Sequence, residues 1–186
     1  MKDWFIVLVG PSGSGKTTIS DALSKQYGLK AIESYTTRAP RYDGERGHIF
    51  LSDAEFDAIE VDRVIAFTEF DGHRYCATTD QVEDSDVYVV DFDGCETMQD
   101  LYHGQKKILA CYIECSEKIR FNRLVNRDGV MAAKRRIEND RVSFDGQFQR
   151  LAGIFEYAIP ICGADAPNES ADAIMKCLEN LKEMVD

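Results

Sequence analysis

Short runs of consecutive apolar residues alternate along this chain with segments whose apolar residues recur every three or four positions. The apolar runs, which are typical of buried strands, fall at 4–9, 64–70, 87–91 and 108–113. The helical patterns fall at 16–27, 52–60, 94–103, 116–127, 131–142 and 170–184. Strands that alternate with helices predict an α/β fold in which helices cover both faces of a parallel sheet.

Two of the expected helices begin with capping sequences. Ser52-Asp53-Ala54-Glu55 is a capping box, and Ser116 can cap the helix that follows it. Near the end of the chain, residues 154–161 indicate a last strand, and residues 170–184 an amphipathic helix that packs on the sheet. No repeat or linker interrupts the pattern, so we expect a single domain over residues 1–186.

The composition agrees with one domain that has a substantial core, because 44% of the 186 residues are hydrophobic. A net charge of −11 argues against general binding to nucleic acids or anionic membranes. We see no charged leader, no removable apolar segment and no stretch as long as a membrane span. The six cysteines lack the paired spacing of a metal site. We therefore expect a reduced, cytoplasmic protein with no nucleic-acid or membrane partner.

Residues 10–17, Gly-Pro-Ser-Gly-Ser-Gly-Lys-Thr, form a complete phosphate-binding loop of the form G-x-x-x-x-G-K-[ST]. An expected strand precedes the loop and an expected helix follows it, which is the setting that this motif needs. Glycines let backbone N–H groups converge on an anion, and the helix N-terminus adds partial positive charge. Lys16 can reach the outer phosphates of a nucleoside triphosphate, and the Thr17 hydroxyl can ligate Mg²⁺. The residues expected to bind ATP are Gly10, Ser12, Gly13, Ser14, Gly15, Lys16, Thr17 and Thr18.

Two further groups of basic residues indicate a second anion site. Arg38 and Arg41 lie three positions apart among hydroxyl side chains, and guanidinium groups suit bidentate binding of phosphate. Residues 117–141 contain eight Lys or Arg against four acids, in an otherwise acidic protein. The alternatives are an ordinary surface loop for the arginine pair and a solvated helix face for the basic segment. Beside a phosphate loop, however, both are typical of a kinase that must hold donor and acceptor phosphates together.

These motifs resemble those of guanylate kinase. Besides the phosphate loop, the similar strings are S-Y-T-T-R-A-P-R-Y-D-G-E from Ser34, F-D-G-H-R-Y-C-A-T from Phe70, V-V-D-F-D-G from Val89 and R-L-V-N-R-D from Arg123. They occur in the family's order over residues 4–141. The resemblance implies a P-loop α/β core (1–33, 82–116 and 142–186), a small lobe that binds the nucleoside monophosphate (34–81) and an arginine-bearing lid (117–141).

The resemblance also implies roles for single residues. The residues that match the acceptor-phosphate site are Ser34, Arg38, Arg41 and Tyr75. Asp93 matches the acidic residue near the acceptor base, and Asp91 is a plausible partner for the water shell of Mg²⁺, with Thr17 as its other expected ligand. The lid arginines match Arg123 and Arg127, with Arg136 as the third and Arg135 as the alternative. The implied catalytic set is Lys16, Arg38, Arg123, Arg127 and Arg136.

The sequence departs from the family pattern around the acceptor. His48 stands where the family has a tyrosine that donates to the acceptor phosphate. Histidine can still donate, more strongly when protonated, and a purely structural role is the alternative. The family's guanine-contacting glutamate and hydroxyl are replaced by Ala66 and Ala77. Glu69 and Thr78 lie close by and can substitute after a shift, but losing such a donor–acceptor pair lowers discrimination between bases.

We therefore expect ATP-dependent phosphorylation of a nucleoside monophosphate, foremost GMP or dGMP. The missing guanine contacts and the string G-H-I-x-L-S at 47–52 also resemble ribose bisphosphate phosphokinase, a related sugar-phosphate kinase. A non-catalytic guanylate-kinase-like module that binds protein partners is a third reading, although such modules usually have degraded phosphate loops. The adenine contacts are expected near 162–168. The sequence leaves the oligomeric state, monomer or homodimer, open.

Overall fold

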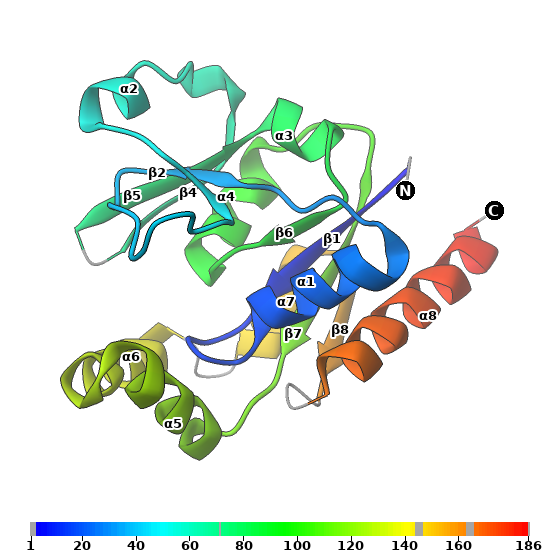
Figure 1. Cartoon of the computed structure of the whole chain (residues 1–186). Helices are drawn as coiled ribbons and strands as arrows, with labels where there is room; N and C mark the ends of the chain where they lie inside the picture. Colours follow the sequence, from blue (N-terminus) through cyan, green and yellow to red (C-terminus); the bar gives the residue numbers. More distant parts are fainter. Residues whose placement is uncertain (1–2, 71, 144–146, 163–165, 186) are drawn as a thin grey trace.

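A computed structural model of the chain describes residues 3–70, 72–143, 147–162 and 166–185. Its centre is a parallel sheet of four strands in the order β6-β1-β7-β8 (Figure 1). These strands are β1 (Trp4–Val9), β6 (Val87–Val89), β7 (Lys107–Ile113) and β8 (Tyr157–Ile161). The loop that follows β1 leads directly into α1 (Lys16–Tyr27), so the phosphate loop lies at the carboxyl end of the sheet.

Helices cover both faces of this sheet. All six residues of β1 are buried, and successive side chains of a strand point to opposite faces. Ile6 and Leu8 pack with α1 and α8 on one face, whereas Phe5 and Val7 pack with α4 and α7 on the other. These further helices are α4 (Phe92–Leu101), α7 (Gln147–Ile154) and α8 (Pro167–Val185). The predicted α/β class, with helices flanking a parallel sheet, is confirmed.

A second sheet, in the order β3-β2-β5-β4, packs through β4 against α4. Its strands are β2 (Ser34–Thr36), β3 (His48–Phe50), β4 (Val64–Phe70) and β5 (His73–Thr78). Strands β2 and β3 are parallel, and the other two pairs are antiparallel. The helix α2 (Asp53–Asp57) and a 3-10 turn (Val61–Arg63) connect β3 to β4, and α3 (Thr79–Glu83) leads from β5 back to β6 of the parallel sheet.

The structure corrects several expectations about single elements. The run at 64–70 is a strand, but it belongs to the second sheet, because the chain turns back at Gly72, whose φ is +75°, and pairs antiparallel as β5. The sequence pattern did not indicate the short strands β2 and β3, nor β5, α3 and α7. The Ser52–Glu55 capping box is present. Ser116 stands at the N-cap of its helix, but its side chain makes no capping hydrogen bond.

The basic segment folds as two helices, α5 (Glu117–Asp128) and α6 (Val130–Ser143), joined at Gly129. They pack on each other around Leu124, Ala133 and Ile137, a hydrophobic cluster separate from the two clusters beside the parallel sheet. In Figure 1 this α5–α6 pair lies apart from the helices that cover the sheet. Among the described residues, no helix combines the length and apolar character needed to cross a membrane.

Candidate active site

The phosphate loop is shaped by glycines that no other residue can replace without strain. Gly13 has a φ of +76°, and a Cβ atom placed on it would lie 3.1 Å from the Arg120 carbonyl oxygen of α5. Gly15, with a φ of +105°, forms the N-cap of α1. The loop therefore packs closely against α5 while the N-terminus of α1 remains directed at the space above it.

Lys16 lies at the centre of this loop. Its Nζ atom donates hydrogen bonds to the carbonyl oxygens of Gly10 at 2.5 Å and Pro11 at 3.1 Å. Burial lowers the pKa of Lys16 to about 8, although the carboxylates of Asp140 and Asp91 act in the opposite direction. An ammonium group that is poorly solvated and close to two loop carbonyls is well prepared to bind an anion.

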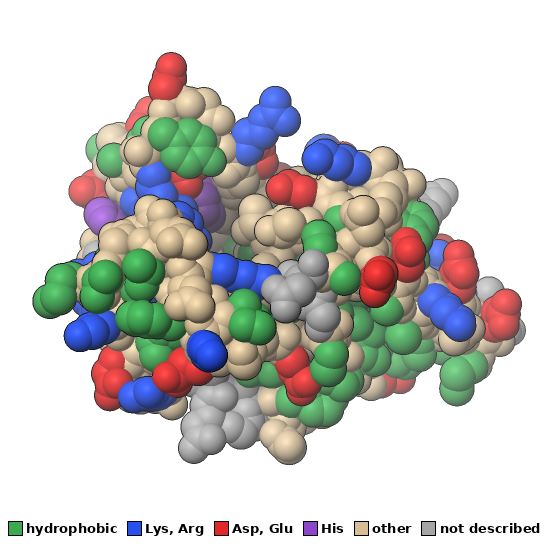
Figure 2. Space-filling view, turned by 60° about the horizontal axis from the view of Figure 1, so that its bottom comes forward, with side chains coloured by type: hydrophobic (Ala, Val, Ile, Leu, Met, Phe, Trp, Pro, Cys, Tyr) green, Lys and Arg blue, Asp and Glu red, His purple; other side chains and the backbone are tan. Residues whose placement is uncertain are grey.

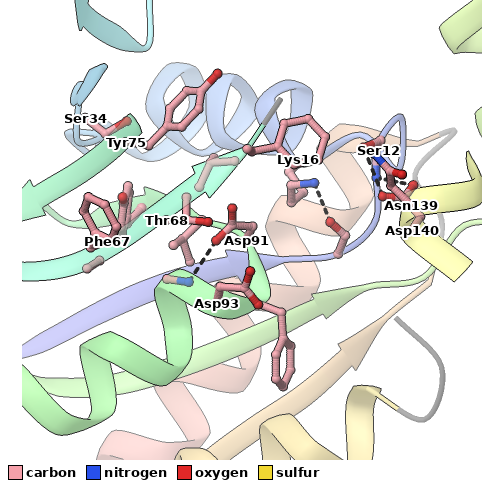
Figure 3. A pocket seen from close by; sticks show the side chains of 18 of the residues that line it. Ser12, Lys16, Ser34, Phe67, Thr68, Tyr75, Asp91, Asp93, Asn139 and Asp140 are labelled. Carbon is pink, nitrogen blue, oxygen red and sulfur yellow. Dashed lines mark hydrogen bonds between the residues drawn. The ribbon is translucent and has the colours of Figure 1, made fainter. Parts of the chain in front are cut away.

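Two cavities meet at this lysine. We call inner cavity the one of about 250 Å³ that lies between the loop, β4, β5 and the start of α4 (Figure 3). The outer cavity, of about 570 Å³, lies over the loop and the start of α1, facing α5. Blue Lys and Arg side chains and a purple His surround a hollow on the face shown in Figure 2. The residues that line both cavities are Ser12, Lys16, His48 and Arg136.

The outer cavity gathers most of the residues expected to bind ATP. They are Ser12, Gly13, Gly15, Lys16, Thr17 and Thr18, while Gly10 lines the inner cavity. Ser14 lines neither cavity because its side chain is buried, and its backbone N–H donates to the Pro11 carbonyl oxygen at 3.2 Å. Of the region where adenine contacts were expected, residues 163–165 lie outside the described residues, and Pro167 lines the outer cavity.

The second sheet brings Ser34, His48 and Tyr75 together on the wall of the inner cavity. Ser34 and His48 are aligned in the β2–β3 pairing, and Ser34 Oγ lies 2.9 Å from His48 Nδ1. The rings of His48 and Tyr75 meet edge to face, with centroids 5.7 Å apart. Three residues predicted to bind the acceptor phosphate therefore lie side by side, although they are far apart in the sequence.

Arg38 and Arg41 are held by one acid, Glu45. Arg38 donates to both carboxylate oxygens of Glu45, at 2.9 and 3.1 Å, and Arg41 donates to it at 3.2 Å. Burial acts to raise the pKa of Glu45, but the hydrogen bonds from Arg38 and Arg41 outweigh it and lower that pKa. Arg41 lines the outer cavity, whereas Arg38 lines neither and lies with its guanidinium 5.3 Å from the centre of the Phe50 ring.

The α5–α6 pair directs three arginines at the cavities. Arg123 donates to the carbonyl oxygens of Gly13 and Ser14, at 3.0 and 3.3 Å, and so contacts the loop itself. Arg127 lines the outer cavity and forms an ion pair with Asp128. Arg136 lines both cavities and packs its guanidinium 5.6 Å from the centre of the Phe70 ring. Arg135, the alternative to Arg136, lies on the outer side of the pair beside Lys134 and Glu138.

Sequence reasoning missed a contact that ties α6 to the phosphate loop. Asp140 accepts hydrogen bonds from the Ser12 backbone N–H at 2.9 Å and the Ser12 hydroxyl at 3.1 Å. The same carboxylate accepts from Arg120 of α5 at 2.7 Å. Arg120 and Asp140 are 7% and 5% exposed, so this ion pair is shielded from water. The only sequence signal was an acid within a basic segment, which did not indicate its partner 128 residues away.

The wall formed by β4 and α4 contains acids and small apolar residues. Asp91 caps α4 by accepting from the Gly94 N–H at 2.9 Å, and Thr68 lines the same cavity. Burial raises the pKa of Asp91. Asp93 and Ala66 line the same wall. Figure 3 shows Lys16 between the side carrying Thr68 and Asp91 and the side carrying Ser12 and Asp140.

The structure does not bring Glu69 and Thr78 to this wall. Residues 66, 67, 68 and 70 of β4 line the inner cavity, whereas Glu69 lines neither cavity and is exposed. Thr78 is buried at the N-cap of α3 and lines neither cavity, and Ala77 is also buried away from both. Thr68 is the polar residue that β4 presents instead, and sequence reasoning overlooked it.

The two expected metal ligands lie on the cavity walls. Thr17 lines the outer cavity and Asp91 the inner one, with Lys16 between the two cavities. Within the described residues, no group of three or more His, Cys, Asp or Glu side chains could hold a metal ion by itself. This donor set fits Mg²⁺, which keeps several waters and is usually held by one or two protein oxygens together with substrate phosphates.

Comparisons with known proteins agree with this architecture. The family model described as AAA domain matches residues 6–143. The fold is similar to that of a guanylate kinase from Anaplasma phagocytophilum, with a TM-score of 0.59 and 20% identity over 96% of this chain and 85% of that chain. It is also similar to an unliganded sugar kinase from Janibacter sp. HTCC2649, with a TM-score of 0.54 and 12% identity over 95% of each chain. A search of curated proteins gives no match.

Proposed function

The chain belongs to the AAA domain family, and from that premise we propose that it transfers the γ-phosphoryl group of ATP to the phosphate of a nucleoside monophosphate. The P-loop kinase fold implies nucleotide binding. The observation that carries the proposal is the common wall of the two cavities, where Lys16, His48 and Arg136 face both spaces. A donor phosphate in the outer cavity and an acceptor phosphate in the inner one would meet at these side chains.

Phosphoryl transfer requires positioning and charge stabilisation rather than a protein nucleophile. The N-terminus of α1 and Lys16 would hold the β- and γ-phosphates. Arg127 and Arg136 of the α5–α6 pair would neutralise charge on the group in transit, and Arg123 would keep the phosphate loop in place. Mg²⁺, held by Thr17 and by Asp91 through water, would supply further neutralisation of the triphosphate when bound. Closure of the α5–α6 pair as a lid would exclude water and favour transfer over hydrolysis.

The acceptor phosphate fits best beside Ser34, His48 and Tyr75. Two arginines of the loop between β2 and β3 would add positive charge. Arg41 lies on the wall of the outer cavity, and Arg38 packs against Phe50. Both guanidinium groups are paired with Glu45 in this structure, so binding would require them to share donors between Glu45 and the phosphate. Asp93 lies further along the inner cavity, in the place where a base would be contacted. We therefore take GMP and dGMP as the first acceptors to test.

A second acceptor is favoured by the small apolar side chain at position 66. Ala66 is 1% exposed and offers no hydrogen-bonding group to a base edge, and neither does the buried Ala77. A site that leaves a base edge without partners discriminates poorly in favour of that base. Ribose 1,5-bisphosphate presents hydroxyls and a phosphate but no base, so it is the second candidate.

The experiment is a steady-state kinase assay with ATP, Mg²⁺ and each of GMP, dGMP, AMP, UMP and ribose 1,5-bisphosphate. We expect turnover with a guanine nucleotide. We also expect kcat/KM to fall about 100-fold or more for Arg136→Ala, while Arg135→Ala, its neighbour on the outer side, changes it little. Turnover with the sugar phosphate alone would replace the proposed acceptor by the second candidate.

A binding module without catalysis is the remaining alternative, and ATP binding separates it from a kinase. Calorimetric titration with ATP should give a 1:1 complex in the wild type, and Lys16→Ala should weaken it. Absence of ATP binding by the wild type would favour the module.

A further inference from the structure

His48 occupies a position from which it can contact the transferred group or its acceptor. It begins β3, is partly exposed, and lines both cavities. Tyr75 packs on its ring from β5, and Ser34 lies beside its Nδ1 atom from β2. The ring is therefore fixed on the side that faces the second sheet, and Nε2 is the nitrogen left to face a ligand.

The partners of Nδ1 determine which nitrogen of the neutral ring bears the proton. The Ser34 hydroxyl lies 2.9 Å from Nδ1 and can either accept or donate, whereas the Ser34 backbone carbonyl can only accept. The carbonyl therefore favours the tautomer in which Nδ1 bears the proton and Nε2 of the neutral ring has a lone pair. In this tautomer the Nε2 lone pair repels a phosphate oxygen, whereas the imidazolium donates from Nε2 and brings a positive charge to the phosphate.

The surroundings of His48 favour the neutral ring over the imidazolium when no anion is bound. Burial lowers the pKa of His48, and the positive charges of Arg38 and Arg41 lower it further, whereas Glu45 and the Ser34 carbonyl act in the opposite direction. The other charged groups on the walls of the same cavities are Lys16, Asp91, Asp93, Arg123, Arg127, Arg136 and Asp140. Cations predominate in the outer cavity, which disfavours an imidazolium in the empty site and favours a dianion.

We propose that His48 binds the acceptor phosphate as the imidazolium, so that acceptor binding is coupled to the uptake of one proton. The proton comes from solvent and is added to Nε2, which then donates to an oxygen of the phosphate dianion. This inference rests on the proposed function for the place of the acceptor. A tyrosine at this position would donate its own hydroxyl proton and take up none, so the coupling is a consequence of the histidine.

The pH dependence of acceptor binding follows from this linkage. The pKa of His48 is below its ordinary value in the free protein, and a bound dianion raises it. Between these two pKa values, acceptor affinity falls with rising pH by up to about tenfold per unit. Below a pH of about 6 the acceptor itself becomes a monoanion and binds less well. Affinity should therefore be highest near that pH and decline through the neutral range.

Histidine NMR tests the coupling directly, because the chain contains only three histidines. The ring C–H signals would be followed against pH in the free protein and with inorganic phosphate, GMP or ribose 1,5-bisphosphate, at constant ionic strength. His48→Gln identifies the His48 signal. We expect its midpoint to rise by about one unit or more with at least one probe, while the signal of the exposed His103 stays in place. An unchanged His48 midpoint with all three probes overturns the inference.

The outcome is distinguishable from failure of the proposed function. A raised His48 midpoint without turnover would leave the inference intact and remove the kinase assignment. Turnover with an unchanged His48 midpoint would overturn the inference and leave the kinase assignment intact. For an acceptor that the protein phosphorylates, His48→Tyr should abolish the decline in acceptor affinity above neutral pH, because the phenol donates a hydrogen bond without a change of charge. His103→Gln should keep the wild-type profile.

Discussion

At the scale of the residue, Lys16 shows how a binding site is maintained at the expense of stability. The unperturbed pKa of a lysine is 10.5, and burial lowers that of Lys16 to about 8. Below pH 8 the folded protein therefore keeps a poorly solvated ammonium group, and this cost disappears as the pH rises from about 8 to 10.5. The carboxylates of Asp140 and Asp91 compensate for it in part, and a bound anion would add to that compensation near neutrality.

We predict that Lys16→Met stabilises the free protein at pH 7 by about 1 kcal/mol, while it lowers activity about 100-fold or more. Melting temperature and urea denaturation at pH 7 would measure the gain, which should shrink as pH rises past 8 because the wild-type lysine then loses its charge. Lys25→Met, on the exposed side of the same helix, is the control and should change stability by less than about 0.5 kcal/mol. Destabilisation by Lys16→Met would contradict this account.

Single residues differ in how far the sequence predicts their position. The positions of Lys16 and Thr17 can be predicted from local spacing, because the residues of the phosphate-loop motif are consecutive and adopt a defined loop conformation. Glu69 was chosen because it lies close to Ala66 in the sequence, but in the structure Thr68 is the polar residue of β4 on the cavity wall. Glu45 belonged to a recognised string, yet its pairing with both Arg38 and Arg41 required the folded loop.

At the scale of the element, α6 is attached to the phosphate loop through one buried carboxylate. Asp140 of α6 accepts hydrogen bonds from Ser12 of the loop and from Arg120 of α5. It therefore links the phosphate loop, α5 and α6. Such a link could not be predicted, because neither partner has a local signature. The α5–α6 pair has its own small hydrophobic cluster, so we expect it to move as one unit in the proposed closure.

We predict that Asp140→Asn destabilises the protein by about 3 kcal/mol, because it leaves Arg120 buried without a counter-charge. Urea unfolding at pH 7 is the measurement. Glu138→Gln is the matched control on the same helix, since Glu138 is exposed and pairs only with the exposed Arg141 across 3.2 Å among the contacts described. We expect it to cost less than about 1 kcal/mol. Equal effects of the two substitutions would show that the buried contact has no special part in the fold.

At the scale of the whole molecule, three parts converge on one wall. The parallel sheet supplies the phosphate loop, the second sheet supplies Ser34, His48 and Tyr75, and the α5–α6 pair supplies Arg136. The hydrophobic pattern predicted the parallel sheet well, because its strands are continuous apolar runs. It did not predict most of the second sheet, whose short strands combine apolar and charged residues and are stabilised by pairing across the sheet.

The central claim is that the γ-phosphoryl group of ATP crosses from the outer to the inner cavity. The most direct test incubates the wild-type protein and Mg²⁺ with ATP labelled at the γ-phosphate, together with GMP, dGMP or ribose 1,5-bisphosphate, and separates the products. The account predicts label in a phosphorylated acceptor, dependent on both the acceptor and Lys16. Label that remains in ATP, or that appears only as inorganic phosphate with every acceptor, would contradict it.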